Sequence, residues 1–220
     1  MSQFNVKLFR GNNYPVLKRK SVLVGDSLGY DLTIKQGKFI SPKNTTSVEG
    51  LGPCIQVLLW SPLKIFNSHS APELEKLGQV GKKVVENAVK LRDDIKNKTG
   101  EIIAFITGGM QYDPKVPISD ESSKFLNEIY DALQEEGIET IVIAGQKKDG
   151  LNKRINTYAR ENSVTCVGGP IKELPKIGKN ADNKEIQEIL EEYFDFVELP
   201  PSAKIEVIDE LPPKTQCKLH

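Results

Sequence analysis

The stretch from Ser47 to Glu73, SVEGLGPCIQVLLWSPLKIFNSHSAPE, constrains the fold more than any other part of the sequence. Its apolar run from Cys54 to Trp60 is bounded by Gly50 to Pro53 on one side and by Ser61-Pro62 on the other, which is typical of a buried central strand. Leu63 to Phe66 is predicted to form a second strand. The stretch therefore predicts an antiparallel hairpin that turns at Ser61-Pro62.

The predicted hairpin brings a cysteine and a histidine to the same end. Cys54 lies about seven residues before the turn and His69 about seven after it, so antiparallel pairing places them side by side. His69 and the C-terminal His220 are the two histidines of the chain. Cys–His chemistry inside the folded body therefore has to use Cys54 and His69.

Such a pair has the chemistry of a cysteine nucleophile. A cysteine needs a base to become a thiolate, and the base is in turn oriented by a third group. The hydroxyl candidates for that third group are Thr45, Thr46 and Ser47. Asn67 is the nearest amide, and the turn at Gly52-Pro53 is expected to expose the backbone N–H of Cys54 to a developing oxyanion.

A structural role is the alternative for both residues. A cysteine that opens an apolar strand is most often a small buried hydrophobe, and a histidine before a helix is more often exposed or capping. The turn, the hairpin spacing and the helix after the histidine give the catalytic interpretation equal weight. The other cysteines, Cys166 and Cys217, are interpreted as structural and incidental.

A long helix is predicted directly after the histidine. Ser70 to Glu73 fits a capping box with proline in the first turn. One helical face then continues over Leu74, Leu77, Val80, Val84, Ala88, Leu91 and Ile95. A helix from about Pro72 to Lys96 is expected, with His69 fixed at its entry.

The remaining elements predict a mixed α/β protein. Strands are expected over Phe4–Phe9, 21–27, 30–40, Glu101–Thr107 and Ile138–Ala144, and a hairpin over Lys153–Ala159 and Ser163–Val167. Helices are expected over 120–137, with Gly137 as the stop, and over 184–194. The order mixes parallel and hairpin connections, which predicts a mixed β-sheet with helices packed on it.

Composition excludes several classes of partner. The 220 residues carry 30 Lys plus Arg against 30 Asp plus Glu, so no net field recruits nucleic acid or anionic lipid. The spacing of the three cysteines fits neither a disulfide framework nor a zinc site. The N-terminal residues lack a signal-peptide pattern, and no apolar run could cross a bilayer. We expect a monomer without membrane insertion, either cytoplasmic or secreted into a host cell without a signal peptide.

The motif LGPCIQVLLWSPLKIFNSH resembles that of the chemotaxis receptor glutamine deamidases, the CheD family. In that family a threonine precedes Leu-Gly-Ser-Cys, an apolar strand and an Asp-Pro turn follow, and a histidine closes the hairpin. The later segments FITGGMQYD, DESSKFLNEIYDALQEEGI and IETIVIAGQKKDGLNKRINTYARENSVTCVGGP follow in the family's order. The resemblance covers about Thr45 to Pro170, and the Cys–His core is also similar to that of deamidating toxins of the cytotoxic necrotising factor type.

The resemblance implies a fold, a reaction and three site residues. It implies a sandwich-like mixed sheet with helices on its outer faces, and a protein-glutamine deamidase that converts glutamine to glutamate through a cysteine thioester. Cys54 would be the nucleophile, His69 the base and acid, and Ser47 would stand at the place of the family's threonine. No metal or organic cofactor is needed, and the partner is a protein substrate with a reactive glutamine.

Departures from the family pattern shape the expected substrate. Ser47 replaces threonine, Pro53 replaces serine, and Lys148 to Arg154 stands where the family has Gly-Gly-x-x-x-Arg. The expected division is a β-rich lead-in over 1–44, the deamidase core over 45–171, and an extension over 172–220 that the family lacks. These differences favour a bacterial effector or toxin. A chemotaxis receptor deamidase, or a non-catalytic binding protein that docks a partner on its extension, is the alternative.

Overall fold

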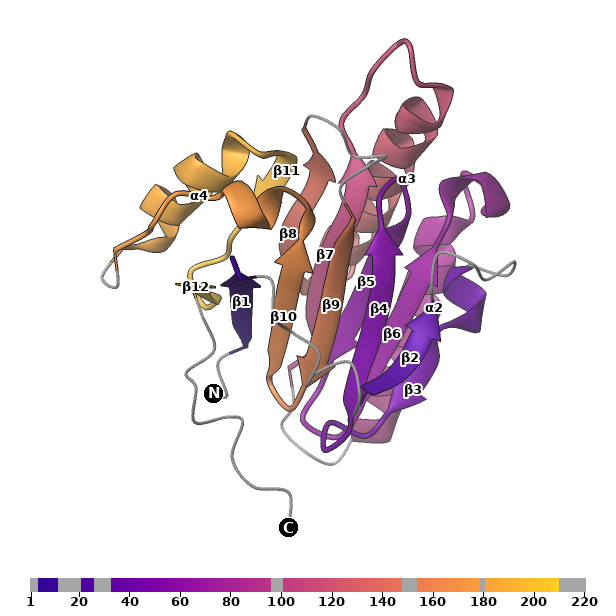
Figure 1. The fold of residues 1–220 in the computed structure, drawn as a ribbon. Coiled ribbons are helices and arrows are strands. Elements are labelled where there is room, and N and C mark those ends of the chain that lie inside the picture. Colours follow the sequence, from indigo (N-terminus) through magenta and orange to yellow (C-terminus); the bar gives the residue numbers. More distant parts are fainter. Residues whose placement is uncertain are drawn as a thin grey trace.

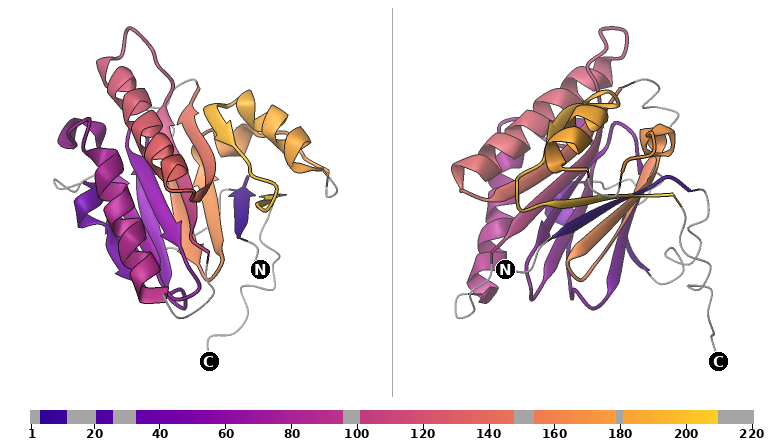
Figure 2. Two further views of the ribbon diagram at one scale, coloured as in Figure 1. Left: turned by 180° about the vertical axis from the view of Figure 1, so that it is seen from behind. Right: turned by 90° about the vertical axis from the view of Figure 1, so that its left-hand side faces the viewer.

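Two β-sheets stack face to face, and two helices cover the outer face of one of them (Figures 1 and 2). The computed structural model describes residues 4–11, 21–25, 33–95, 101–147, 154–178 and 181–209. The resulting layers are helices, sheet and sheet, so the fold is the α/β class with mixed sheets that the sequence predicts.

Sheet A has the strand order β12-β1-β10-β9-β4-β2. Its strands are β1 (Asn5–Phe9), β2 (Ser21–Gly25), β4 (Thr45–Leu51), β9 (Ile155–Arg160), β10 (Ser163–Gly168) and β12 (Lys204–Ile208). β1 runs parallel to both β10 and β12, and β2 runs parallel to β4, whereas β9 is antiparallel to β4 and β10. The sheet is therefore mixed, and its first and last strands in sequence are neighbours.

Sheet B has the order β11-β8-β7-β5-β6-β3. Its strands are β3 (Lys38–Ile40), β5 (Ile55–Trp60), β6 (Ile65–Ser70), β7 (Ile103–Met110), β8 (Glu139–Gln146) and β11 (Phe194–Glu198). β7 and β8 pair in parallel and the other neighbours are antiparallel. The hairpin predicted from the sequence is β5–β6, at the centre of this sheet.

Side chains alternate along the strands of sheet B, so the buried residues form two cores, one on each face of this sheet. Leu58 and Trp60 of β5 face sheet A, whereas Val57 and Leu59 face the helices. The helices are α2 (Val80–Ile95) and α3 (Pro117–Glu135), which lie across the back of the sheet (Figure 2). Because both faces of sheet B are covered, β5 and β6 are buried along their whole length.

The start of the long helix differs from the prediction. Strand β6 continues to Ser70, a short 3-10 helix η2 (Pro72–Leu74) follows, and α2 begins at Val80. The expected capping box does not form, because Ser70 lies in a strand. His69 therefore lies inside β6 and not at a helix entry.

A buried glutamate explains the late start of α2. The carboxylate of Glu75 accepts hydrogen bonds from the Ile34 N–H at 2.5 Å and from Lys83 Nζ at 2.7 Å. This anchor holds the segment before α2 in a non-helical path. Leu74 and Leu77, which the periodicity placed on the buried face, are consequently 48% and 43% exposed.

The other elements agree more closely with the sequence. Helix α3 begins at Pro117 and ends before Gly137, which adopts a φ of 64°. The β9–β10 hairpin turns where expected, with Glu161 in the left-handed region. In the segment 30–40 the described residues form a 3-10 helix η1 (Ile34–Gln36) followed by the short strand β3, whereas the sequence predicted one strand. Residues 26–32 and Lys153 lie outside the described residues.

The two terminal segments are integral parts of the sheets. β1 lies inside sheet A between β10 and β12, and β11 pairs with β8 of sheet B. Two helical elements precede β11 and β12 in the sequence: the 3-10 helix η3 (Gly169–Glu173) and α4 (Asn183–Glu191). The side chain of Asp182 caps α4 by accepting a hydrogen bond from the Glu185 N–H. The segments before residue 45 and after residue 171 therefore contribute strands to the same two sheets as the segment between them.

Across the described residues, the longest helices are too short or too polar to cross a lipid bilayer.

Candidate functional site

Cys54 and His69 lie on the same face of sheet B, turned toward sheet A. Gln56 of β5 is the direct partner of His69 of β6, and Ile55 is the partner of Ser70. Cys54 lies two positions before Gln56 and packs against the core between the sheets. Cys54 and His69 are therefore diagonal neighbours, at a Cβ separation of about 7 Å in regular pairing.

The register differs from the one that the sequence predicted. Trp60 pairs with Ile65 across a turn in which the Ser61 N–H donates to the Lys64 carbonyl at 2.9 Å. Residue 54 would thus pair with residue 71 and not with 69. Because side chains alternate with a period of two, this even shift keeps His69 on the same face as Cys54.

A polar row lies beside the cysteine on the inner face of sheet B. His69, Gln56 and Thr107 are directly opposite one another on β6, β5 and β7, with exposures of 3%, 0% and 1%. In the next row on the same face, Leu58 and Phe105 are apolar and the buried Asn67 lies beside Leu58. Buried polar side chains are retained where they are hydrogen-bonded or have a function, so this end of the sandwich is the candidate site.

Hydrogen bonds connect this row to sheet A. Gln56 Nε2 donates to Asn67 Oδ1 at 2.7 Å, and Asn67 Nδ2 donates to Thr46 Oγ1 at 3.1 Å. The Thr46 hydroxyl donates to the Val22 carbonyl at 3.2 Å. Asn67, noted in the sequence as the nearest amide, is therefore part of the site's surroundings.

Ser47, the residue that the resemblance implied as the third catalytic group, is not brought to the pair. Thr46 and Val48 face sheet B, so the alternation of β4 turns Ser47 toward the opposite face. There its hydroxyl donates to Ser21 Oγ at 2.8 Å. Thr45 shares the face of Ser47. Of the three candidate hydroxyls, Thr46 is the one that points toward the residues around His69.

The segment from Gly50 to Cys54, which is the end of β4 and the loop that follows it, is hydrogen-bonded to four other elements. The bonds are Gly50 N–H to Asn156 Oδ1 at 2.8 Å, Gln146 Nε2 to the Leu51 carbonyl at 3.1 Å, Ser122 Oγ to the Pro53 carbonyl at 3.2 Å, and Gly109 N–H to the Cys54 carbonyl at 2.9 Å. Their partners come from β9, β8, α3 and β7. A nucleophile on such a loop is pre-oriented, which lowers the entropy lost in reaching the reactive geometry.

Two glycines of β7 permit the close approach to Cys54. Gly108 and Gly109 have φ of 87° and 70°, and a Cβ at Gly108 would lie 2.3 Å from the Cys54 carbonyl oxygen. The Gly-Gly pair looked like an ordinary strand end in the sequence, yet β7 continues to Met110. Glycine inside a strand pattern is the signal of close backbone approach that could have revealed this role.

Gly108→Ala should displace the Cys54 loop. A positive φ alone costs an alanine about 1–2 kcal/mol, and the steric overlap with the Cys54 carbonyl should add about 1–3 kcal/mol. Gly78→Ala is the matched control, because Gly78 has a φ of 81° and no atom within 4 Å of the added Cβ. Urea unfolding should show the larger loss for Gly108→Ala. Equal losses in the two variants would contradict the close approach.

Burial keeps the Cys54 thiol protonated. Desolvation is the largest effect and the Glu73 carboxylate adds to it, and together they raise the pKa of Cys54 to about 11. Arg154 and a hydrogen bond from the cysteine's own backbone N–H act in the opposite direction on this pKa. At neutral pH the sulfur is a thiol, so a reaction at this residue needs a base that removes the proton.

The two charged neighbours should have opposite effects on the reactivity of Cys54. Glu73→Gln removes a charge that disfavours the thiolate, so alkylation by iodoacetamide at pH 8 should accelerate, whereas Arg154→Gln should slow it. Both side chains are exposed, so each change should be about two- to fivefold and should shrink in high salt. Effects of the same sign in the two variants would show that these charges do not act on Cys54.

No metal site accompanies the pair within the described residues. There, no group of three or more His, Cys, Asp or Glu side chains could hold an ion. Cys166 is buried in the core between the sheets, and burial raises the pKa of its thiol. Its position fits the structural role predicted from the sequence.

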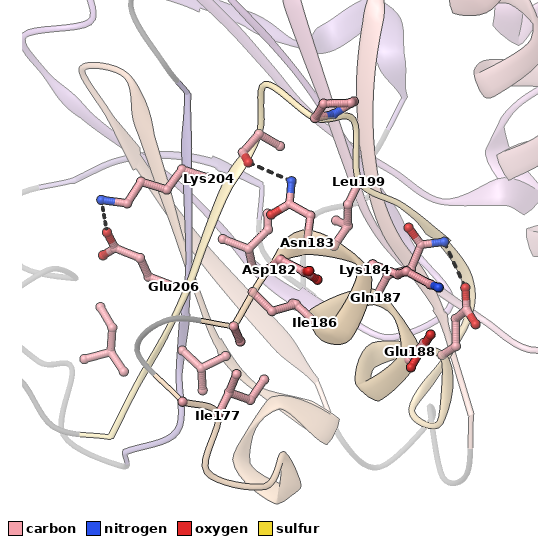
Figure 3. Close-up of a pocket in the computed structure, with 18 residues that line it drawn as sticks. Ile177, Asp182, Asn183, Lys184, Ile186, Gln187, Glu188, Leu199, Lys204 and Glu206 are labelled. Carbon is pink, nitrogen blue, oxygen red and sulfur yellow. Dashed lines mark hydrogen bonds and ion pairs between the residues drawn. The ribbon is translucent and has the colours of Figure 1, made fainter.

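A groove lies apart from the Cys–His pair, between α4 and β12 (Figure 3). Apolar side chains line part of it, including Ile177, Ile186 and Leu199. Charged side chains of α4 and β12 line the remainder. The C-terminal segment thus builds a concave surface of its own.

Neither models of known protein families nor curated protein sequences give a match for this chain.

Proposed function

We propose that the protein is a protein-glutamine deamidase of the CheD-like superfamily, with Cys54 as nucleophile and His69 as base and acid. The observation that carries the proposal is the placement of Cys54 on a loop held from four elements, diagonal to a buried histidine on the adjacent strand. The resemblance of the motif around Cys54 supplies the reaction type. Two titratable groups in this arrangement suit covalent catalysis at a carboxamide.

The reaction proceeds in two stages. His69 takes the proton of the Cys54 thiol as the sulfur attacks the carboxamide carbon of a substrate glutamine. The tetrahedral intermediate collapses when His69 gives that proton to the departing nitrogen, which leaves as ammonia. A thioester between Cys54 and the glutaminyl carbonyl remains.

Water completes the reaction. His69 removes a proton from a water molecule as its oxygen attacks the thioester carbon, and the Cys54 sulfur leaves and regains a proton. The net change consumes one water and releases one ammonia and a glutamate side chain. Every proton passes between sulfur, imidazole, ammonia and water, so the scheme balances without a redox partner.

We propose a host-directed bacterial effector or toxin as the biological role, with a chemotaxis receptor deamidase as the alternative. Pro53, the side chain of Ser47 turned away from the pair, and the added strands after Pro170 all depart from the receptor-deamidase pattern. The effector would act inside a host cell, whereas the receptor deamidase would act in the bacterial cytoplasm. In either role we expect a monomer acting on a protein substrate.

Mass spectrometry of treated lysates tests the function and the role together. Bacterial and eukaryotic lysates are incubated with the wild type or with Cys54→Ala, and peptides are searched for the gain of about one dalton that follows from replacing an amide by an acid. A Cys54-dependent gain in eukaryotic proteins supports the effector. A gain confined to chemotaxis receptors supports the alternative, and no gain in either lysate contradicts the deamidase.

A non-catalytic binding protein is the second candidate, because the C-terminal segment offers a docking surface. β12 is the edge strand of sheet A, with β1 as its neighbour. The groove beside it carries Asp182, Glu188, Glu191 and Glu206 against Lys184 and Lys204. This surface suits an extended basic segment that adds a strand to the sheet edge. Binding of a basic peptide that survives Cys54→Ala, without any mass gain, would favour this candidate.

A further inference from the structure

Gln146 is a buried amide at the end of β8, between the ends of β7 and β11. It pairs with Met110 of β7 on one side and with Phe194 of β11 on the other. Its carbonyl accepts from the Gln111 N–H at 3.0 Å, and the residue is 2% exposed. The main chain of Gln146 is therefore fixed from both sides, and one of the two supports is a strand of the C-terminal segment.

Gly145 turns the side chain of Gln146 toward sheet A. Ile143 faces sheet A and Ala144 faces the helices, so regular alternation would direct Gln146 toward the helices. Gly145 has a φ of 72°, in the left-handed region that glycine adopts readily, and this breaks the alternation. Gln146 Nε2 instead donates to the Leu51 carbonyl of β4 at 3.1 Å. The side-chain bond thus joins the two sheets.

This bond lies where the chain itself crosses from one sheet to the other. β4 ends at Leu51 in sheet A, β5 begins at Ile55 in sheet B, and Cys54 is the last residue of the crossing. The Cys54 carbonyl accepts from the Gly109 N–H at 2.9 Å. Only two residues separate the two bonded carbonyls, and one of them is a proline with a fixed φ. The position of Cys54 relative to sheet A therefore depends on the bond from Gln146.

The other half of the Gln146 amide makes no hydrogen bond. A backbone carbonyl can only accept, so Nε2 has to face Leu51 and Oε1 points the other way. Oε1 is buried and has no hydrogen-bond partner among the described residues. A Cβ at Gly169 would lie 3.0 Å from this oxygen, so the glycine leaves room for it. An unpaired buried oxygen calls for an explanation beyond stability.

We propose that Gln146 is a positioning residue, which holds the Leu51 carbonyl and thereby places the Cys54 sulfur for attack on the substrate carboxamide. The inference rests on the proposed function, since the attack by Cys54 is the step that this placement serves. β11 takes part through its pairing with Gln146. The C-terminal segment therefore supports the site in addition to forming the groove.

Alkylation of Cys54 tests the inference without any substrate. In a Cys217→Ser background, Gln146→Met removes the donor and keeps the length of the side chain. Release of the Leu51 carbonyl should expose Cys54, so labelling by iodoacetamide at pH 8 should accelerate about three- to tenfold, while Cys166 stays unlabelled. An unchanged rate at Cys54 would overturn the proposal. Labelling of both cysteines would also overturn it, because it would indicate a general loosening of the fold.

Gln111→Met is the matched control. Gln111 Nε2 donates to Asp195 Oδ1 at 3.3 Å in an exposed pair, and the bond from its main chain to Gln146 survives the substitution. This variant should leave the labelling of Cys54 unchanged. If Gln146→Met does not fold, Gln146→Asn serves instead, because its amide is one methylene too short to reach Leu51. An unchanged rate at Cys54 in a folded Gln146→Asn would then overturn the proposal.

Kinetics separate this inference from the proposed function. With a deamidation substrate, Gln146→Met should lower kcat about 10- to 100-fold with little change in KM, as expected for a misplaced nucleophile. Faster alkylation together with slower deamidation is a combination that a loss of stability alone does not produce. An unchanged kcat would contradict the positioning role while the proposed function stands. If the wild type deamidates nothing and labelling still depends on Gln146, the proposed function fails and the link from Gln146 to Cys54 stands.

Discussion

Replacing Cys54 by alanine should abolish the gain of about one dalton on the target protein, with a loss of at least about 10⁴-fold in rate. No other described thiol can take its place, because Cys166 lies buried in the core between the sheets. The Cys54 side chain is partly exposed, so its removal should change the unfolding free energy by less than about 1–2 kcal/mol. Timed intact-mass measurements with the wild type and the variant give the ratio of rates.

Cys166→Ala is the matched control for this experiment. It also removes a thiol. Cys166 lies on β10, between β9 and β1 of sheet A, and its side chain does not reach His69. It should cost about 1–2 kcal/mol of stability through the cavity it leaves, while the deamidation rate stays near that of the wild type. A Cys54→Ala protein that keeps even about one hundredth of the activity would exclude the thioester mechanism.

Alkylation of Cys54 should be slow at neutral pH and should accelerate toward pH 11. The thiolate is the reacting form, and a pKa raised from 9.0 to about 11 lowers its fraction about a hundredfold below that of an unperturbed thiol. The folded state favours the neutral thiol, so the rate should rise about tenfold per pH unit until it levels near pH 11. Iodoacetamide labelling of a Cys217→Ser protein over a pH series measures this profile.

The shape of the profile distinguishes two states of the site. A steady rise means that the resting site holds a neutral thiol and that His69 acts as a base during the reaction. A plateau below about pH 8 would instead indicate a preformed thiolate–imidazolium pair and would contradict the raised pKa. The profile should be read from native protein below the unfolding transition, where Cys166 stays unlabelled. Slow labelling combined with no deamidated target favours the binding protein.

Local patterns predicted the elements that depend on local interactions. The β5–β6 hairpin, helix α3 and the β9–β10 hairpin follow from apolar runs and turn residues within each segment. The start of α2 could not be predicted in this way, because Glu75 is held by Ile34, which lies 41 positions earlier.

The candidate site was predicted in part. The predicted register of the hairpin was wrong by two residues. Cys54 and His69 nevertheless share a face, as predicted, because an even shift keeps a side chain on the same side of the sheet. An odd error would have placed His69 among the helices. The hydrogen bonds from Gln56 to Asn67 and from Asn67 to Thr46 could not be predicted, since the second of them joins strands of two stacked sheets. Ser47 was placed by resemblance alone, and the alternation of β4 turns it away.

The position of β1 has a consequence for how the chain is made. This strand leaves the ribosome more than 150 residues before its neighbours β10 and β12. Until then both of its edges lack partners, and nascent edge strands invite pairing with other chains. Sheet A therefore closes around β1 only after β10 and β12 have been synthesised, when the hairpin with Cys54 and His69 has long been available to fold.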